Sequence, residues 1–261
     1  MNDDANDTKG APAASRRPKL PHIDVFETGA LVDGIQQRMN RRVFFQLWVF
    51  DVPAAGDVTE AARALEAALI DAGLGGVVYD DVSAPRGLGL LAFTENPVDI
   101  VALRTSFTAA PLSGLVFRHE FTMFGRTYAG GYERDLEQWI IDRPKQTVLN
   151  EAWPWAIWYP LRRTGAFQDL EGPHKGRVIG EHATIGRAYG EQDLAHDVRL
   201  ACHGLDQNDN EFVLGIIGRD LHPLSHVVEA MRSTEQTSRY IEKMGPFFVG
   251  RARARVAERS G

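Results

Sequence analysis

The order in which helix-like and strand-like segments follow one another constrains the fold of this chain more than any other feature. Residues 43–52 are rich in aromatic and β-branched side chains and end at Pro53, which is typical of a strand. Residues 57–72 carry apolar side chains at helical spacing before Gly73, which predicts a helix. The next segments are predicted as strand, strand, helix and strand, at 76–79, 88–93, 97–108 and 115–124. This β-α-β-β-α-β order is the ferredoxin-like pattern.

The second half of the chain repeats this order of elements without repeating the residues. It is predicted to contain a strand, a helix, two strands, a helix and a final strand, at 155–161, 174–189, 198–203, 211–217, 223–232 and 247–249. We therefore predict an α+β protein of two fused ferredoxin-like halves, with helices on one face of each sheet. The predicted boundaries are a flexible arm over 1–38, the first half over 39–150, the second half over 151–251 and a basic tail over 252–261.

Composition and charge argue against several classes of function. The formal net charge of −6, without a basic block in the body of the chain, argues against a nucleic-acid partner. No run approaches the roughly 18 apolar residues that cross a membrane, and the first residues lack the apolar core of a signal peptide. The single cysteine, Cys202, rules out an intramolecular disulfide. It lies in an apolar run, so we expect a buried thiol in a reducing cytoplasm.

A histidine in the second half marks the candidate site. His182 lies inside a predicted helix, and Gly186 follows it one turn later. A flat ring stacked on that helix face could have its metal bound by His182 while Gly186 leaves room for the ring. A lone helical histidine is more often a surface or core residue than a metal ligand, so the assignment depends on the surrounding motifs.

Three short motifs surround this histidine. They are Tyr-Pro-Leu-Arg-Arg over 159–163, His-Ala-Thr-Ile-Gly-Arg-Ala-Tyr over 182–189 and Gly-Leu-Asp over 204–206. Together they resemble the chlorite dismutase family of heme proteins, which includes the coproheme decarboxylases. The resemblance implies that His182 is the proximal iron ligand, with Ile185 and Gly186 beside the porphyrin. It also implies that the two sheets form one continuous antiparallel β layer or barrel with the helices outside.

The same resemblance gives roles to three further side chains. In coproheme decarboxylases a Tyr-Pro-Met-Ser-Lys segment lies beside the ring, where its tyrosine forms the radical that attacks a propionate and its lysine binds propionate. Tyr159 matches this tyrosine, and Arg163 stands at the lysine position, where it keeps the charge and adds a fork for a carboxylate. Arg232 matches a Met-Arg pair of the family, and it either reaches a propionate or is a solvated residue at a helix end.

Two positions depart from the pattern of the chlorite dismutases. Those enzymes carry a distal arginine seven residues before Gly-Leu-Asp, where this chain has Asp197 beside His196. The missing arginine argues against chlorite decomposition. His196 or Asp197 is then a candidate distal base, and the alternative is a pair of loop residues that cap a strand. The glutamate that binds the proximal histidine is also missing from the apolar strand near Ile217, which predicts a weaker proximal hydrogen bond.

Three hypotheses follow. The first is peroxide-dependent oxidative decarboxylation of iron-coproporphyrin (coproheme) to heme b, with the bound ring as substrate and hydrogen peroxide as oxidant. The resemblance implies that this enzyme is a homopentamer, and we expect it in the cytoplasm. The second is a heme b protein for redox, electron-transfer or sensor functions, with weak peroxidase activity. The third is a ferredoxin-like binding module without heme, against which the presence of His182 argues.

Overall fold

The first half of the chain forms the predicted ferredoxin-like unit in a computed structural model that describes residues 20–259. Its helix α1 begins after Asp57, whose carboxylate accepts hydrogen bonds from two backbone N–H groups, and ends at Gly73, which has a left-handed φ of 71°. The strands lie in the order β7-β3-β5-β4. The elements are β3 (Phe44–Asp51), α1 (Val58–Ala72), β4 (Gly75–Asp81), β5 (Gly87–Thr94), α2 (Pro97–Thr105), β6 (Val116–Phe117) and β7 (Met123–Arg126).

The second half has the same arrangement. Its strands lie in the order β12-β8-β10-β9, and β11 pairs with the end of β8 beside β12. The short helices α4 and α7 and the strand β11 were not predicted from the sequence. The elements are β8 (Trp155–Arg163), α4 (Gly165–Gln168), α5 (Gly172–Glu191), β9 (His196–Ala201), β10 (Phe212–Gly218), α6 (Leu221–Arg232), α7 (Glu235–Tyr240), β11 (Ile241–Met244) and β12 (Phe248–Val256).

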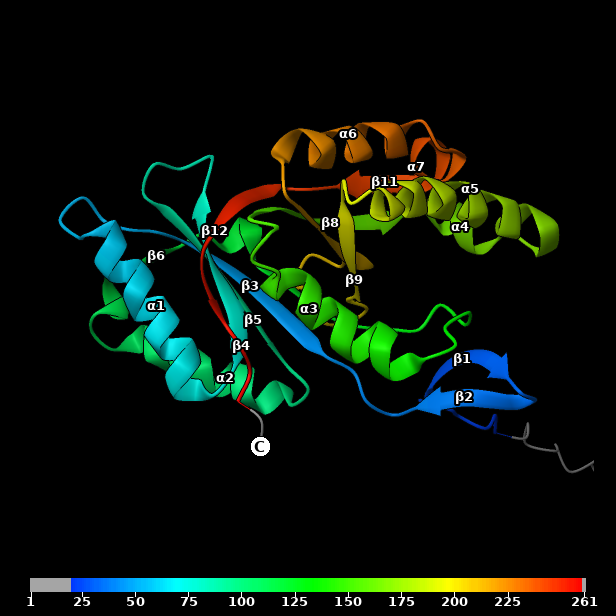
Figure 1. Cartoon of the computed structure of the whole chain (residues 1–261), viewed down its shortest axis with the longest axis horizontal. Helices are drawn as coiled ribbons and strands as arrows, with labels where there is room; N and C mark the ends of the chain where they lie inside the picture. Colours follow the sequence, from blue (N-terminus) through cyan, green and yellow to red (C-terminus); the bar gives the residue numbers. More distant parts are fainter. Residues whose placement is uncertain (1–19, 260–261) are drawn as a thin grey trace, which may run out of the picture.

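The two sheets close into one barrel. The edge strand β4 of the first half pairs antiparallel with β12, and β7 meets β9 at the pair Arg126 and Ala201. The ring therefore runs β7-β3-β5-β4-β12-β8-β10-β9 and returns to β7. Helices α1 and α2 cover the outside of the first half, while α5 and α6 lie over the second (Figure 1). The predicted fold class, two ferredoxin-like halves with a continuous antiparallel sheet, is confirmed.

Aromatic rings fill the inside of the barrel and lie against glycines of neighbouring strands. Trp158 of β8 is fully buried and stands directly across from Gly215 of β10. A Cβ atom at Gly215 would come within 2.5 Å of the Trp158 ring. Phe93 and Gly75 form the same kind of cross-strand pair in the first half. At these positions only glycine allows the close approach of the ring.

Residues 27–39 and 252–256 form strands where the sequence predicts an arm and a tail. The predicted flexible arm over 1–38 contains a hairpin of β1 (Glu27–Val32) and β2 (Ile35–Met39), and its residues 1–19 lie outside the described part. The predicted basic tail over 252–261 begins as part of β12, which continues to Val256 because it pairs with β4. Within the described residues, no helix is long and apolar enough to cross a membrane.

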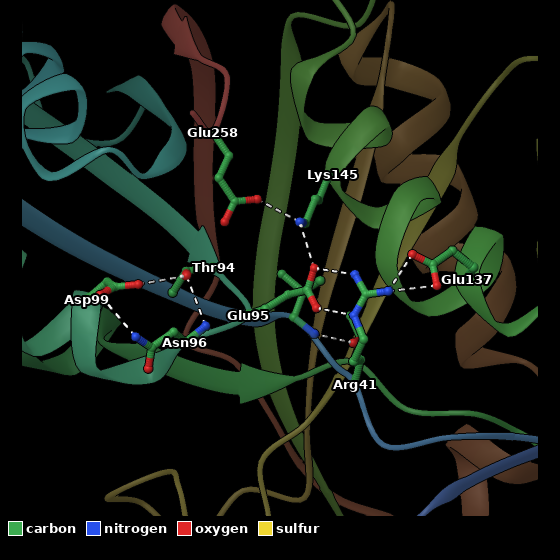
Figure 2. A network of polar contacts seen from close by, with 10 residues as sticks. Arg41, Thr94, Glu95, Asn96, Asp99, Glu137, Lys145 and Glu258 are labelled. Carbon is green, nitrogen blue, oxygen red and sulfur yellow. Dashed lines mark hydrogen bonds and ion pairs between the residues drawn. The ribbon is translucent and has the colours of Figure 1, made fainter. Parts of the chain in front are cut away.

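The linker between the halves is held against the first half by a network of charges. It contains a π-helical turn, Gln138–Asp142, followed by α3 (Arg143–Leu149). Arg41 lies between the carboxylates of Glu95 and Glu137, and Lys145 of α3 bonds Glu258 at 2.6 Å (Figure 2). The network therefore joins the loop before β3, the end of β5, the linker and the segment after β12.

Candidate functional site

The outer face of the second sheet brings together residues from three strands. Leu214 of β10 stands across from Tyr159 of β8 on one side and from Arg199 of β9 on the other. Trp158 and Val198, the strand neighbours of Tyr159 and Arg199, belong to the barrel interior. Because side chains alternate along a strand, Tyr159, Leu214 and Arg199 form a row on the outer face, which α5 and α6 cover. We call this set the outer row.

Helix α5 lies over this face, but few of its own side chains are buried. Only Val178 of its 20 residues is buried. His182, Ile185 and Tyr189 are half-buried, and a Cβ atom at Gly186 would lie 3.4 Å from the Met231 side chain of α6. The predicted room beside Gly186 therefore faces α6 in this structure. Because Ile185 and Tyr189 are only half-buried, part of their apolar surface is available for a ligand.

His182 has one ring nitrogen occupied by the protein and one available. Its Nδ1 lies 3.4 Å from the Thr234 hydroxyl, whereas Nε2 has no hydrogen-bond partner among the residues described. Burial lowers the pKa of His182 because it disfavours the imidazolium, and the positive charge of Arg199 lowers this pKa further. The imidazole is therefore neutral at physiological pH, which is the form that binds a metal.

Tyr159 is buried under an aromatic ring. It is 4% exposed, and its ring stacks on Phe247 with centroids 4.6 Å apart. Burial raises its pKa well above the usual value, although the charge of Arg232 lowers it in part. The phenol therefore keeps its proton at neutral pH. Arg232, at the end of α6, is exposed and makes no ion pair with any described residue.

Arg163, the predicted propionate contact, pairs with a carboxylate of the protein in this structure. Its guanidinium donates to both carboxylate oxygens of Glu211, at 3.0 and 3.3 Å, and lies over the rings of Phe167 and Phe212. Burial alone would raise the pKa of Glu211, but the hydrogen bonds and charge of Arg163 outweigh it and hold this pKa below its usual value. The charge of Arg163 is thus already compensated within the protein.

The two candidate distal bases also lie in unexpected surroundings. His196 is on the face of β9 that is directed to the barrel interior, the face opposite to the outer row. Its ring stacks on Trp153 with centroids 3.6 Å apart, and its Nε2 lies 2.8 Å from the Asp193 carboxylate. Asp197 is on the outer face, where it pairs with Arg143 at 2.8 Å and Arg199 at 3.0 Å.

The two arginines determine the charge of Asp197. Burial would raise its pKa, but Arg199 and Arg143 together hold it below the usual range. Asp197 therefore stays ionised and is a weak base. Counting seven residues back from Gly-Leu-Asp leads to Asp197 and misses Arg199, which is a further functional candidate. Residues two apart in a strand share a face, so an arginine two positions after Asp197 has the same orientation.

The fold and the site together define a class of protein: a barrel of two ferredoxin-like units with a histidine-bearing helix over the outer face of the second sheet. The family model for chlorite dismutase matches residues 58–253. The chain belongs to the chlorite dismutase family. No curated protein matches this sequence at a significant level.

Solved structures of similar fold share little sequence with this chain. A heme-binding protein from Thermus thermophilus is 20% identical with a TM-score of 0.62, and the match covers 81% of this chain and 90% of that one. A chlorite dismutase from Candidatus Nitrospira defluvii in complex with imidazole is 14% identical with a TM-score of 0.62, over 81% and 91% of the two chains. At such low identity these matches support the fold alone.

Proposed function

We propose that the protein binds an iron porphyrin (heme b or coproheme) between α5 and the outer row, with His182 Nε2 as the iron ligand. Membership of the chlorite dismutase family supports this cofactor. The residues present fit such a ring. Among the residues that the structure describes, His182 Nε2 has no hydrogen-bond partner and can bind iron, and Arg232 has no ion pair and can bind a carboxylate. Half-buried Ile185 and Leu214 offer apolar surface for the ring.

We further propose that the reaction is peroxide-dependent oxidative decarboxylation of coproheme to heme b. The observation that carries this proposal is the outer row, which aligns a buried phenol and an arginine beneath the helix of His182. The bound iron supplies the activation of peroxide and the oxidation chemistry. The protein supplies a neutral phenol at Tyr159, a cation at Arg232 for a propionate, and a cation at Arg199 for the oxidant.

The protonation state of Tyr159 defines its part in this reaction. Because burial raises its pKa, the phenolic Oη is protonated at neutral pH, and its oxidation must release a proton together with an electron. The nearby cation Arg232 favours a propionate carboxylate at the same end of the site. Arg163 has no role in this proposal, because Glu211 occupies its guanidinium.

The test is to load the purified chain with coproheme, add hydrogen peroxide in small steps and follow the mass of the porphyrin. We expect stepwise loss of two carboxyl groups. Tyr159→Phe should abolish this loss and leave coproheme binding intact. Tyr132→Phe is the matched control, because Tyr132 is 83% exposed and should react as the wild type does. His182→Ala should remove the bound iron porphyrin.

A second candidate is a heme b protein for redox, electron-transfer or sensor functions. Two observations favour it: Phe247 covers Tyr159, and Arg163 is neutralised by Glu211. It predicts tighter binding of heme b than of coproheme, and an unchanged porphyrin mass after peroxide. A homopentamer in the cytoplasm stays a prediction for either candidate, and the molar mass of the loaded protein in solution tests the pentamer.

A further inference from the structure

Thr234 occupies the junction between α6 and α7 and contacts the candidate iron ligand. It is 1% exposed and is the N-terminal cap of α7, where its hydroxyl accepts the N–H of Thr237 at 3.3 Å. The same hydroxyl donates to the carbonyl oxygen of Met231 at 2.8 Å. Its Oγ1 lies 3.4 Å from His182 Nδ1.

The direction of these hydrogen bonds determines the proton position on the imidazole. The Thr234 hydroxyl has two acceptors besides the imidazole: the Met231 carbonyl at 2.8 Å and the Thr237 hydroxyl at 3.3 Å. With its single proton on the nearer Met231 carbonyl, Thr234 Oγ1 accepts from His182. His182 then carries its proton on Nδ1, and Nε2 is left with a lone pair for a metal. No other hydrogen bond to the imidazole is present among the residues described.

We propose that Thr234 is the positioning residue of the iron ligand: it fixes the orientation and the tautomer of His182, in place of a carboxylate partner. This inference rests on the proposed function, because it assumes that His182 binds iron. A hydroxyl is a weaker acceptor than a carboxylate, so the imidazole gives less electron density to the metal. The ferric state of the bound heme is then less stabilised than it would be with a carboxylate at the same place.

Three substitutions separate this role from the capping of α7. Thr234→Ser keeps both the cap and the neutral acceptor. Thr234→Asp keeps a good cap but makes the acceptor a carboxylate. Thr234→Val removes both. Each variant is loaded with heme b, and two properties are measured: the ferric/ferrous midpoint potential, and the rate at which heme is lost to an excess of a heme-scavenging protein.

We expect Thr234→Ser to match the wild type in both properties and Thr234→Asp to have a lower midpoint potential. Thr234→Val should lose heme about tenfold faster, in line with the usual effect of removing a partner of a metal-bound histidine. Equal potentials for the wild type, Thr234→Ser and Thr234→Asp would overturn the proposal and leave Thr234 as a cap only. If Thr234→Val does not fold, the midpoint potentials of Thr234→Ser and Thr234→Asp still test whether Thr234 acts on the iron ligand.

His182→Ala separates the failure of this inference from failure of the proposed function. If His182→Ala binds heme with the affinity and spectrum of the wild type, then His182 is not the ligand and both proposals are wrong. If His182→Ala loses heme while Thr234→Asp keeps the wild-type potential, only the role of Thr234 is wrong.

Discussion

The contact between Arg163 and Glu211 gives a quantitative prediction for Arg163→Met. The two side chains are each 16% exposed, and the guanidinium donates to both carboxylate oxygens. Methionine keeps much of the apolar contact with Phe167 and Phe212. It leaves the Glu211 carboxylate with the backbone N–H of residue 163 at 2.8 Å and the Gln168 amide at 3.5 Å, and with no cation. Hydrogen bonds to charged groups contribute roughly 1.5–3 kcal/mol, so we expect the free energy of unfolding to fall by about 2 kcal/mol.

Urea unfolding measures this change. The midpoint should fall while the slope with urea stays constant, because the surface exposed on unfolding is nearly the same. Arg232→Met is the matched control, since Arg232 is exposed and unpaired among the described residues; its stability should stay within about 0.5 kcal/mol of the wild type. Each single change leaves one buried charge without its partner, whereas Arg163→Met combined with Glu211→Gln leaves none, so the double variant should cost less than the sum of the single changes.

Binding of the porphyrin separates the two possible roles of Arg163. We expect Arg163→Met to bind coproheme as the wild type does, and Arg232→Met to bind it more weakly. The reverse pattern, with unchanged stability and weakened binding in Arg163→Met, would refute the argument. It would show that Arg163 leaves Glu211 and holds a propionate, as the sequence motif predicts.

Further predictions concern the barrel, the charge network and the cysteine. Gly215→Ala should lower the free energy of unfolding by about 2 kcal/mol, because its Cβ would overlap the Trp158 ring; an unchanged urea midpoint would contradict this. Hydrogen bonds from Arg41 hold the pKa of Glu95 below its usual 4.5, so Glu95 stabilises the fold above that pH. The stability difference between wild type and Glu95→Gln should therefore shrink as the pH falls below 4.5, and a constant difference would count against it. Burial raises the pKa of Cys202, so a thiol reagent should modify it only in the unfolded protein, and rapid labelling of the native protein would contradict this.

Much of the fold could be predicted because it follows from local patterns. The helix expected over 174–189 is α5, Gly172–Glu191, and the strands and helices of both halves follow the predicted order. The prediction of Cys202 as a buried residue is confirmed. The hairpin β1–β2 was missed because its second strand, with the sequence IQQRM, has little apolar alternation. The helix α3 was missed because Pro144, which suits a first helical turn, also suits a loop.

The candidate site was harder to predict, since its partners are distant in the sequence. Nothing near Arg163 indicates that Glu211, 48 residues away, binds its guanidinium. Counting residues back from Gly204 leads to Asp197, and Arg199 lies two residues further along the same strand. Both side chains are on the same face, so the face alone does not say which of the two takes the distal position; the pairing of β9 with β10 places Arg199 across from Leu214. The contact between His182 and Thr234 depends on how α5 packs on α7, which no local motif describes.

The strand β12 belongs to both halves at once. Its first residues pair with Trp155 to Trp158 of β8, and the stretch from Gly250 to Val256 pairs with β4 of the first half. If one half unfolds, β12 loses its partner in that half, and backbone N–H and C=O groups of the other half are left unpaired. The cooperative unit of unfolding is therefore the whole barrel, and a chain cut between the halves would carry an open edge on each piece where strands of two copies could join.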